Sequence, residues 1–199
     1  MSILNQIIKT KKNEIELSKK INSISDLEKF EQFNRVTNSL SKSLLNNNFG
    51  IIAEHKRKSP SKSIINKNPS VKEVIIGYEK AGVSGISVLT DKTYFGGSSE
   101  DLIIARKNTF LPILRKEFII DEYQIFEAKA LGADAILLIA SCLSKEMIKK
   151  FSQCAKKLGL EVLIEIHSFK ELNDCLIDSI DIIGVNNRNL KTFKVDTQI

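Results

Sequence analysis

The chain has 199 residues, of which 42% are hydrophobic, and its formal net charge is +6 at pH 7. This length and hydrophobic content suffice for a buried core and exclude a disordered chain. The lysines are scattered among acidic residues, which argues against a nucleic-acid-binding surface, whereas a small phosphorylated substrate would make use of the same positive charge.

The cysteines and the apolar runs bear on the cellular compartment. Cys142, Cys154 and Cys175 show no spacing typical of a metal site or of a disulfide framework, as expected in the reducing cytoplasm. The N-terminal apolar run is too short for a signal peptide, and no stretch approaches about 20 apolar residues. We therefore predict a cytoplasmic protein without a membrane-spanning segment.

Residues 1–45 predict a helical extension. Within it, Ile3, Leu4, Ile7 and Ile8 form an apolar stripe at helical spacing. The pattern changes at Gly50, so that residues 46–199 form a second unit, in which short β-branched runs alternate with amphipathic ones.

The alternating unit predicts six strands with helices between them. The strands are continuous apolar runs, which is typical of parallel strands covered on both faces. Gly82, Gly132 and Gly159 are placed to end helices, and Ser98 and Ser144 to begin them. The strands are predicted at 50–56, 85–90, 111–118, 133–140, 160–167 and 180–187, and the helices at 71–82, 98–108, 121–132, 144–159 and 168–176.

Two α/β architectures fit this spacing. A closed (β/α)₈ barrel of the TIM type has about 250 residues, so that this chain would supply six of its eight βα units. An open doubly wound sheet, in contrast, is complete with five or six strands. Spacing alone leaves both architectures open.

Polar residues gather at the C-terminal ends of the predicted strands. Residues two apart on a strand share a face, so Glu54 and Lys56 point the same way, as do Asn186 and Arg188. Charged groups are costly inside a barrel, but at its C-terminal rim they are typical of an active site. The residues concerned are Glu54, Lys56, Asp91, Lys116, Glu165, Asn186 and Arg188.

The segments that carry these residues resemble, in order and in spacing, blocks of the indole-3-glycerol-phosphate synthase family. The motifs Glu-x-Lys-x-x-Ser-Pro-Ser and Gly-Val-Asn-Asn-Arg-Asn-Leu are the most specific. The matching segments are 51–63, 85–98, 111–125, 132–143, 160–167 and 182–196.

The resemblance implies a fold and an activity. The fold would be a (β/α)₈ barrel with an N-terminal extension. The activity would be that of a decarboxylating lyase of tryptophan biosynthesis, without a metal or an organic cofactor. This enzyme converts 1-(o-carboxyphenylamino)-1-deoxyribulose 5-phosphate to indole-3-glycerol phosphate, carbon dioxide and water.

The resemblance also implies roles for the rim residues. Lys116 matches the general acid that protonates the ketone oxygen of the substrate, and Glu165 matches the glutamate of the later proton transfers. Lys56 matches a lysine implicated in dehydration, and Glu54 would hold and tune it. The substrate-binding residues implied are Asn186, Arg188, Ser59, Pro60 and Ser61.

The two histidines have no part in this set. By parity, His55 faces the helices and is interpreted as structural. His167 shares the face of Glu165, but a single histidine does not make a metal site.

Three interpretations remain open at this point. In the first, the chain is an active synthase whose last two units lie outside this sequence or come from another chain. In the second, it is an inactive remnant that serves at most as a binding partner. In the third, it is the neighbouring isomerase of the same pathway, although none of the cysteines ends the first predicted strand, as that enzyme would require.

Overall fold

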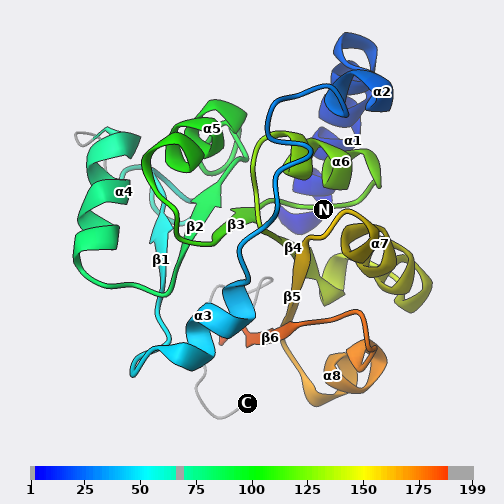
Figure 1. Ribbon diagram of the computed structural model, residues 1–199. Helices are drawn as coiled ribbons and strands as arrows, with labels where there is room; N and C mark the ends of the chain where they lie inside the picture. The colour runs from blue at the N-terminus through cyan, green and yellow to red at the C-terminus, as the bar shows by residue number, and fades with distance from the viewer. Residues whose placement is uncertain (1–2, 66–69, 188–199) are drawn as a thin grey trace.

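The computed structural model describes residues 3–65 and 70–187. Helices and strands alternate after an N-terminal helical segment (Figure 1). The elements are α1 (Ile3–Ile21), α2 (Ile24–Leu27), α3 (Leu40–Asn46), β1 (Ile52–His55), α4 (Val71–Lys80), β2 (Gly85–Leu89), α5 (Ser99–Asn108), β3 (Ile113–Lys116), α6 (Tyr123–Ala130), β4 (Ala135–Ile139), the short 3₁₀ helix η1 (Ala140–Cys142), α7 (Lys145–Lys157), β5 (Glu161–Ile166), α8 (Phe169–Cys175) and β6 (Ile182–Val185). No helix in these two described ranges is long and apolar enough to cross a membrane.

The six strands form one parallel sheet in which each strand pairs with the next along the chain, in the order β1 to β6. A doubly wound sheet reverses its strand order at a switch point, and this sheet does not. The sheet curls, with helices around its outside, as in part of a (β/α)₈ barrel (Figure 1). The partial barrel is therefore the correct architecture, and the open doubly wound alternative is wrong.

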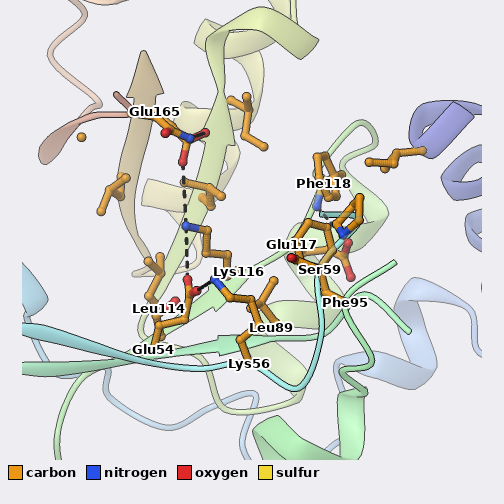
Figure 2. A pocket seen from close by; sticks show the side chains of 18 of the residues that line it. Glu54, Lys56, Ser59, Leu89, Phe95, Leu114, Lys116, Glu117, Phe118 and Glu165 are labelled. Carbon is orange, nitrogen blue, oxygen red and sulfur yellow. Dashed lines mark hydrogen bonds and ion pairs between the residues drawn. The ribbon is translucent and has the colours of Figure 1, made fainter. Parts of the chain in front are cut away.

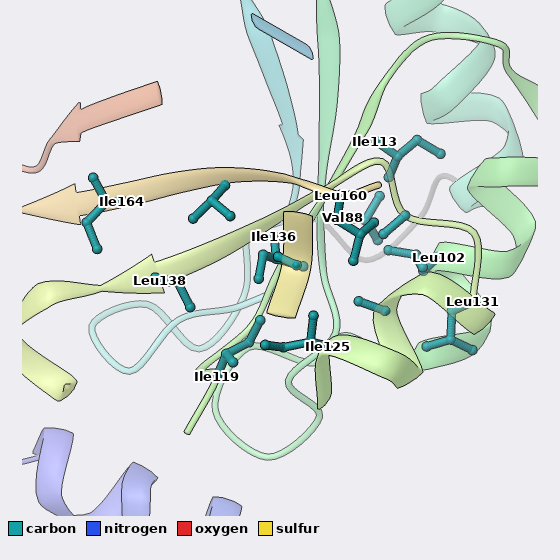
Figure 3. Packing of buried hydrophobic residues seen from close by; sticks show 14 of the residues in the cluster. Val88, Leu102, Ile113, Ile119, Ile125, Leu131, Ile136, Leu138, Leu160 and Ile164 are labelled. Atoms are coloured by element: carbon teal, nitrogen blue, oxygen red, sulfur yellow. The ribbon is translucent and has the colours of Figure 1, made fainter. Parts of the chain in front are cut away.

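The two faces of the sheet bury different hydrophobic clusters because successive side chains on a strand alternate between faces. On the outer face, Val88, Ile136, Leu138 and Ile164 pack against helix residues such as Leu102 (Figure 3). The inner face carries a smaller cluster of Leu114, Ala135, Leu137 and Ile139 with Leu40 of α3. Apolar residues on both faces explain the continuous apolar runs of the strands.

The signals for helix ends are confirmed. Gly82, Gly132 and Gly159 have φ angles of 75°, 93° and 74°, a region that L side chains rarely adopt. The side chains of Ser98 and Ser144 accept hydrogen bonds from backbone N–H groups in the first turns of α5 and α7.

The prediction of helix throughout residues 1–45 is wrong for residues 28–39, which separate α2 from α3. This segment is held instead by bonds to the ends of distant elements. Asp134 accepts hydrogen bonds from the backbone N–H of Asn38 and from the guanidinium of Arg35, both at 2.7 Å. Thr37 donates a hydrogen bond to the carbonyl of Gly159. In a helix, the backbone N–H of Asn38 would bond to a carbonyl four residues earlier, but here it bonds to Asp134. Contacts with distant residues therefore decide the conformation of this segment, and local periodicity does not.

Candidate active site

A cavity of about 650 Å³ opens at the C-terminal ends of the strands, on the inner face of the sheet. Its charged and amide groups come from β1, β3 and β5 and from the residues after β1, β3 and β6. The predicted site residues that line it are Glu54, Lys56, Ser59, Pro60, Ser61, Lys116, Glu165 and Asn186. Arg188, the remaining predicted site residue, lies outside the described residues.

Lys116 lies between two carboxylates in this cavity (Figure 2). Its Nζ atom is 3.3 Å from Oε2 of Glu54 and 3.8 Å from Oε2 of Glu165. The other oxygen of Glu54 accepts a hydrogen bond of 2.5 Å from Lys56, and the other oxygen of Glu165 accepts one of 3.1 Å from Asn186. One continuous network thus joins strands β1, β3 and β5 with the end of β6.

The charges of this network balance in pairs, two lysines against two glutamates. Burial works to raise the pKa of Glu54, but Lys116 and Lys56 outweigh it, and the net pKa is lowered. Glu54 is therefore ionised at neutral pH, where it holds both ammonium groups by charge-assisted bonds.

The loop that follows β1 is held by contacts with the loop after β2 and with the first turn of α5. Arg57 donates hydrogen bonds to both carboxylate oxygens of Asp101 and, at 3.0 Å, to the carbonyl of Gly96. A short antiparallel bridge between Ser59 and Lys62 closes the tip of the loop. These contacts place the hydroxyl-bearing residues Ser59 and Ser61 at the wall of the cavity.

Much of the remaining lining of the cavity is apolar. Phe95 and Phe118 lie with their ring centroids 6.0 Å apart, and both line the cavity (Figure 2). Further apolar lining comes from the inner face of the sheet and from the first helix: Leu89, Leu114, Leu137, Ile139, Leu163, Ile3, Leu4 and Ile7. The cavity thus combines the Glu54, Lys116 and Glu165 network with an aromatic surface at Phe95 and Phe118.

A buried ion cluster fixes α1 beside this wall. Lys11, which is only 4% exposed, lies 3.1 Å from Asp91, 3.0 Å from Glu117 and 2.6 Å from Glu14. Burial works to lower the pKa of Lys11, but Glu117 and Asp91 outweigh it and the net pKa is raised, so the group stays cationic.

Asp91 therefore differs from the other rim residues that were predicted with it. It is fully buried, does not line the cavity, and accepts hydrogen bonds from the backbone N–H groups of Tyr94 and Phe95. In the sequence, Asp91 follows a strand just as a catalytic residue of a barrel would. Its ion pair with Lys11 shows that it instead joins the loop after β2 to α1.

Neither histidine is among the residues that line the cavity. His55 is 4% exposed, and burial, with a smaller effect of Arg57, lowers its pKa, in keeping with the structural interpretation. His167 follows β5 and lies 3.7 Å from Glu165. The described residues include no group of three His, Cys, Asp or Glu side chains that could hold a metal ion.

A family model for indole-3-glycerol phosphate synthase matches residues 4–199. An indole-3-glycerol phosphate synthase of Bacteroides thetaiotaomicron is 46% identical over 98% of this chain and 75% of its own length. Another, of Caldanaerobacter subterraneus, is 45% identical over 98% of this chain and 75% of its own length. This chain belongs to the indole-3-glycerol phosphate synthase family.

The family model and both of these relatives are synthases, so the isomerase interpretation of the sequence is wrong. The chain spans about three quarters of the length of the synthases named above. Among solved structures, a variant of the carboxyl transferase domain of Rhizobium etli pyruvate carboxylase with pyruvate has a TM-score of 0.50 at 11% identity, over 69% of this chain and 28% of that chain. At this identity the likeness shows the fold alone.

Several lining residues of this synthase cavity were not predicted. Ser87, on the inner face of β2, lines the cavity, and its hydroxyl has no hydrogen-bond partner within the described part of the chain. Phe95 and Phe118 stand in loops after strands, where no periodicity marks them. Phe95 follows the predicted strand 85–90 and Phe118 ends the predicted strand 111–118, and this closeness to polar rim residues was the one signal that could have identified them.

Proposed function

We propose that this chain carries out the indole-3-glycerol phosphate synthase reaction in the cavity at the C-terminal ends of its strands. The substrate would be 1-(o-carboxyphenylamino)-1-deoxyribulose 5-phosphate, a small phosphorylated molecule with an aromatic ring at one end. The observation that carries the proposal is the position of Lys116 between Glu54 and Glu165, in a cavity with an aromatic wall. The cytoplasm suits this chain, whose three cysteines are free.

Ring closure would begin at the ketone of the substrate. The apolar wall with Phe95 and Phe118 suits the aromatic ring of the substrate, which would stack or pack there. The ammonium of Lys116 would donate a proton to the ketone oxygen as the aryl carbon that bears the carboxylate attacks the ketone carbon. A cationic acid favours this step because it neutralises the alkoxide as it forms.

Loss of carbon dioxide would restore the aromatic ring. The leaving group is neutral, so an apolar wall favours it over the charged carboxylate that entered. Lys56, at the polar side, would hold the carboxylate first and later protonate the hydroxyl that leaves as water. Arg188, which lies outside the described residues, is proposed as a second partner of the carboxylate, because a guanidinium matches it with two parallel bonds.

Glu165 would complete the reaction as the base. Removing a proton from the methylene carbon beside the nitrogen, as water leaves, forms the double bond of the indole. Asn186 donates a hydrogen bond to Oε1 of Glu165, which leaves Oε2 to act on the substrate or on Lys116. Glu54 would hold Lys56 and Lys116 in place, and the loop with Ser59, Pro60 and Ser61 would close the cavity beside the phosphate.

The test is the appearance of indole fluorescence when the purified chain meets the substrate. Lys116→Met should lower kcat by roughly 10²- to 10⁴-fold, the usual contribution of a general acid. Lys72→Met, at an exposed position of α4, is the matched control and should keep the rate of the parent. If the parent chain binds the substrate but forms no indole, the inactive remnant is the correct interpretation. An undiminished rate in Lys116→Met would rule out the assigned acid.

A further inference from the structure

His167 lies between two carboxylates, one in the cavity and one outside it. Its Nε2 atom is 3.7 Å from Oε1 of Glu165, and its Nδ1 atom is 3.6 Å from Oε2 of Glu171 on α8. The backbone N–H of His167 donates a 2.7 Å hydrogen bond to the same oxygen of Glu171, which fixes that carboxylate beside the ring. The side chains become more exposed in order, with 12% for Glu165, 15% for His167 and 26% for Glu171.

The imidazole is buried without hydrogen bonds. Both ring nitrogens are inaccessible to solvent, and neither has a hydrogen-bond partner among residues 3–65 and 70–187. Buried polar groups in proteins almost always have partners, so a ring with two unpaired nitrogens calls for a reason. Both carboxylates are only slightly beyond hydrogen-bonding distance, so a small movement of the ring gives it a bond on either side.

The proton balance of the proposed reaction supplies that reason. Two protons are added to the ketone oxygen, which leaves as water, and one proton is recovered from the methylene carbon. Because the carboxylate leaves as neutral carbon dioxide, each turnover takes up one proton from solvent. A substrate or product bound against Lys116 and Glu165 would hinder proton entry through the cavity, so a second path would let this proton arrive before the product leaves.

We propose that His167 is a positioning residue that acts through Glu165 and relays protons to it from Glu171 at the surface. This inference rests on the function proposed above for Glu165. A proton from solvent binds Glu171, passes to Nδ1 of His167, and leaves from Nε2 to Oε1 of Glu165. Oε2 of Glu165 returns the methylene proton to Nζ of Lys116, which lies 3.8 Å away (Figure 2). The relayed proton follows along the same atoms, and Glu54, which bonds both lysines, passes a proton from Lys116 to Lys56, so that both lysines end the turnover charged and Glu165 ionised.

The surroundings of the ring favour this route. Asn186 binds Oε1 of Glu165 from the side of β6 and holds the carboxylate in place without competing for a proton. The thiol of Cys142, in η1, is a further titratable group near Glu165 and Glu171. Burial, aided by Glu165 and Glu171, raises the pKa of this thiol to about 12, so it stays protonated and takes up no proton from the relay. The two carboxylates are therefore the proton-exchanging neighbours of His167 in the described part of the chain.

The experiment compares His167→Asn with the parent chain under saturating substrate. Asparagine can bond to Glu165 but cannot carry a proton, so kcat should fall by about tenfold or more while KM changes little, since a proton-transfer group of this kind contributes at least that much. Added imidazole should restore part of the lost rate in His167→Asn and leave the parent unaffected. Glu171→Gln should also lower kcat, and Lys170→Gln, at an exposed position of the same helix, should not.

Two results would overturn the relay. The first is an unchanged kcat in His167→Asn. The second is a lower kcat that imidazole does not restore together with a lower midpoint of thermal unfolding, which marks a merely structural histidine. Glu165→Gln separates this inference from the proposed function. If Glu165→Gln keeps full activity, Glu165 is not the base; if it is inactive and His167→Asn is fully active, only the relay fails.

Discussion

Nζ of Lys116 lies 3.3 Å from Oε2 of Glu54, although β2 separates the strands on which the two residues stand. The contact is possible because both side chains point to the inner face of a curled sheet, where alternate strands approach one another. Since Glu54 also binds Lys56 at 2.5 Å, one carboxylate orients both lysines.

Glu54→Gln should therefore impair catalysis through both lysines. The variant keeps the shape of the side chain but loses its charge, and a charged hydrogen bond contributes about 1.5–3 kcal/mol. If that stabilisation is lost in the transition state, kcat falls by roughly 10- to 100-fold. Indole fluorescence under saturating substrate measures the effect. Glu79→Gln, at an exposed position of α4, is the control, and equal rates in the two variants would contradict the role of Glu54.

Lys11→Met should destabilise the fold. The substitution leaves the carboxylates of Asp91 and Glu117 buried without their cation. Breaking a buried ion pair in this way costs about 3–5 kcal/mol. The free energy of unfolding in urea is the measurement, and Lys12→Met, at the exposed neighbouring position, is the matched control. A difference between the two variants of less than about 1 kcal/mol would mean that the cluster does not hold α1 as described.

Two glycine substitutions should have opposite effects on stability. A Cβ atom at Gly97 would lie 2.0 Å from the carbonyl oxygen of Leu89, so Gly97→Ala must move the backbone at the end of β2. At Gly77, inside α4, a Cβ atom meets nothing within 4 Å, and Gly77→Ala should stabilise the helix by about 0.5–1 kcal/mol. Thermal unfolding compares them. A midpoint for Gly97→Ala at or above that of the parent would show that the loop is not constrained there.

Glu161 should make the fold sensitive to acid. Burial works to raise its pKa, but hydrogen bonds from Ser39 and Ser41 outweigh it, and the net pKa is lowered. A lowered pKa in the folded state stabilises the protein fully above the ordinary glutamate value of about 4.3, and this contribution is lost as the pH falls through the folded value.

Glu161→Gln should accordingly be less stable than the parent by about 1 kcal/mol at neutral pH. The difference should shrink as the pH is lowered through the folded pKa of Glu161, below about 4.3. Urea unfolding of the two proteins at a series of pH values measures it. A difference that stays constant across this range would show that the charge of Glu161 does not hold α3.

The strands, the helix ends and most of the polar rim could be predicted from the sequence, because each depends on residues near one another in the chain. Apolar runs indicate buried parallel strands, and the glycines and serines mark where helices end and begin. The position of Glu54, Lys56, Lys116 and Glu165 at the ends of strands is likewise a local property, since parallel strands bring those ends to one edge.

Only the tertiary structure decided which of these side chains meet. Asp91 lies just after β2, much as Lys116 lies at the end of β3. Asp91 is nevertheless buried in an ion pair with Lys11, which belongs to a helix far away in the sequence. The pairing of Phe95 with Phe118 and the bonds of residues 28–39 to Asp134 are equally non-local. Such contacts depend on strand register, sheet curl and helix packing acting together, so the energies that select them arise between distant segments and leave no periodic pattern in the sequence.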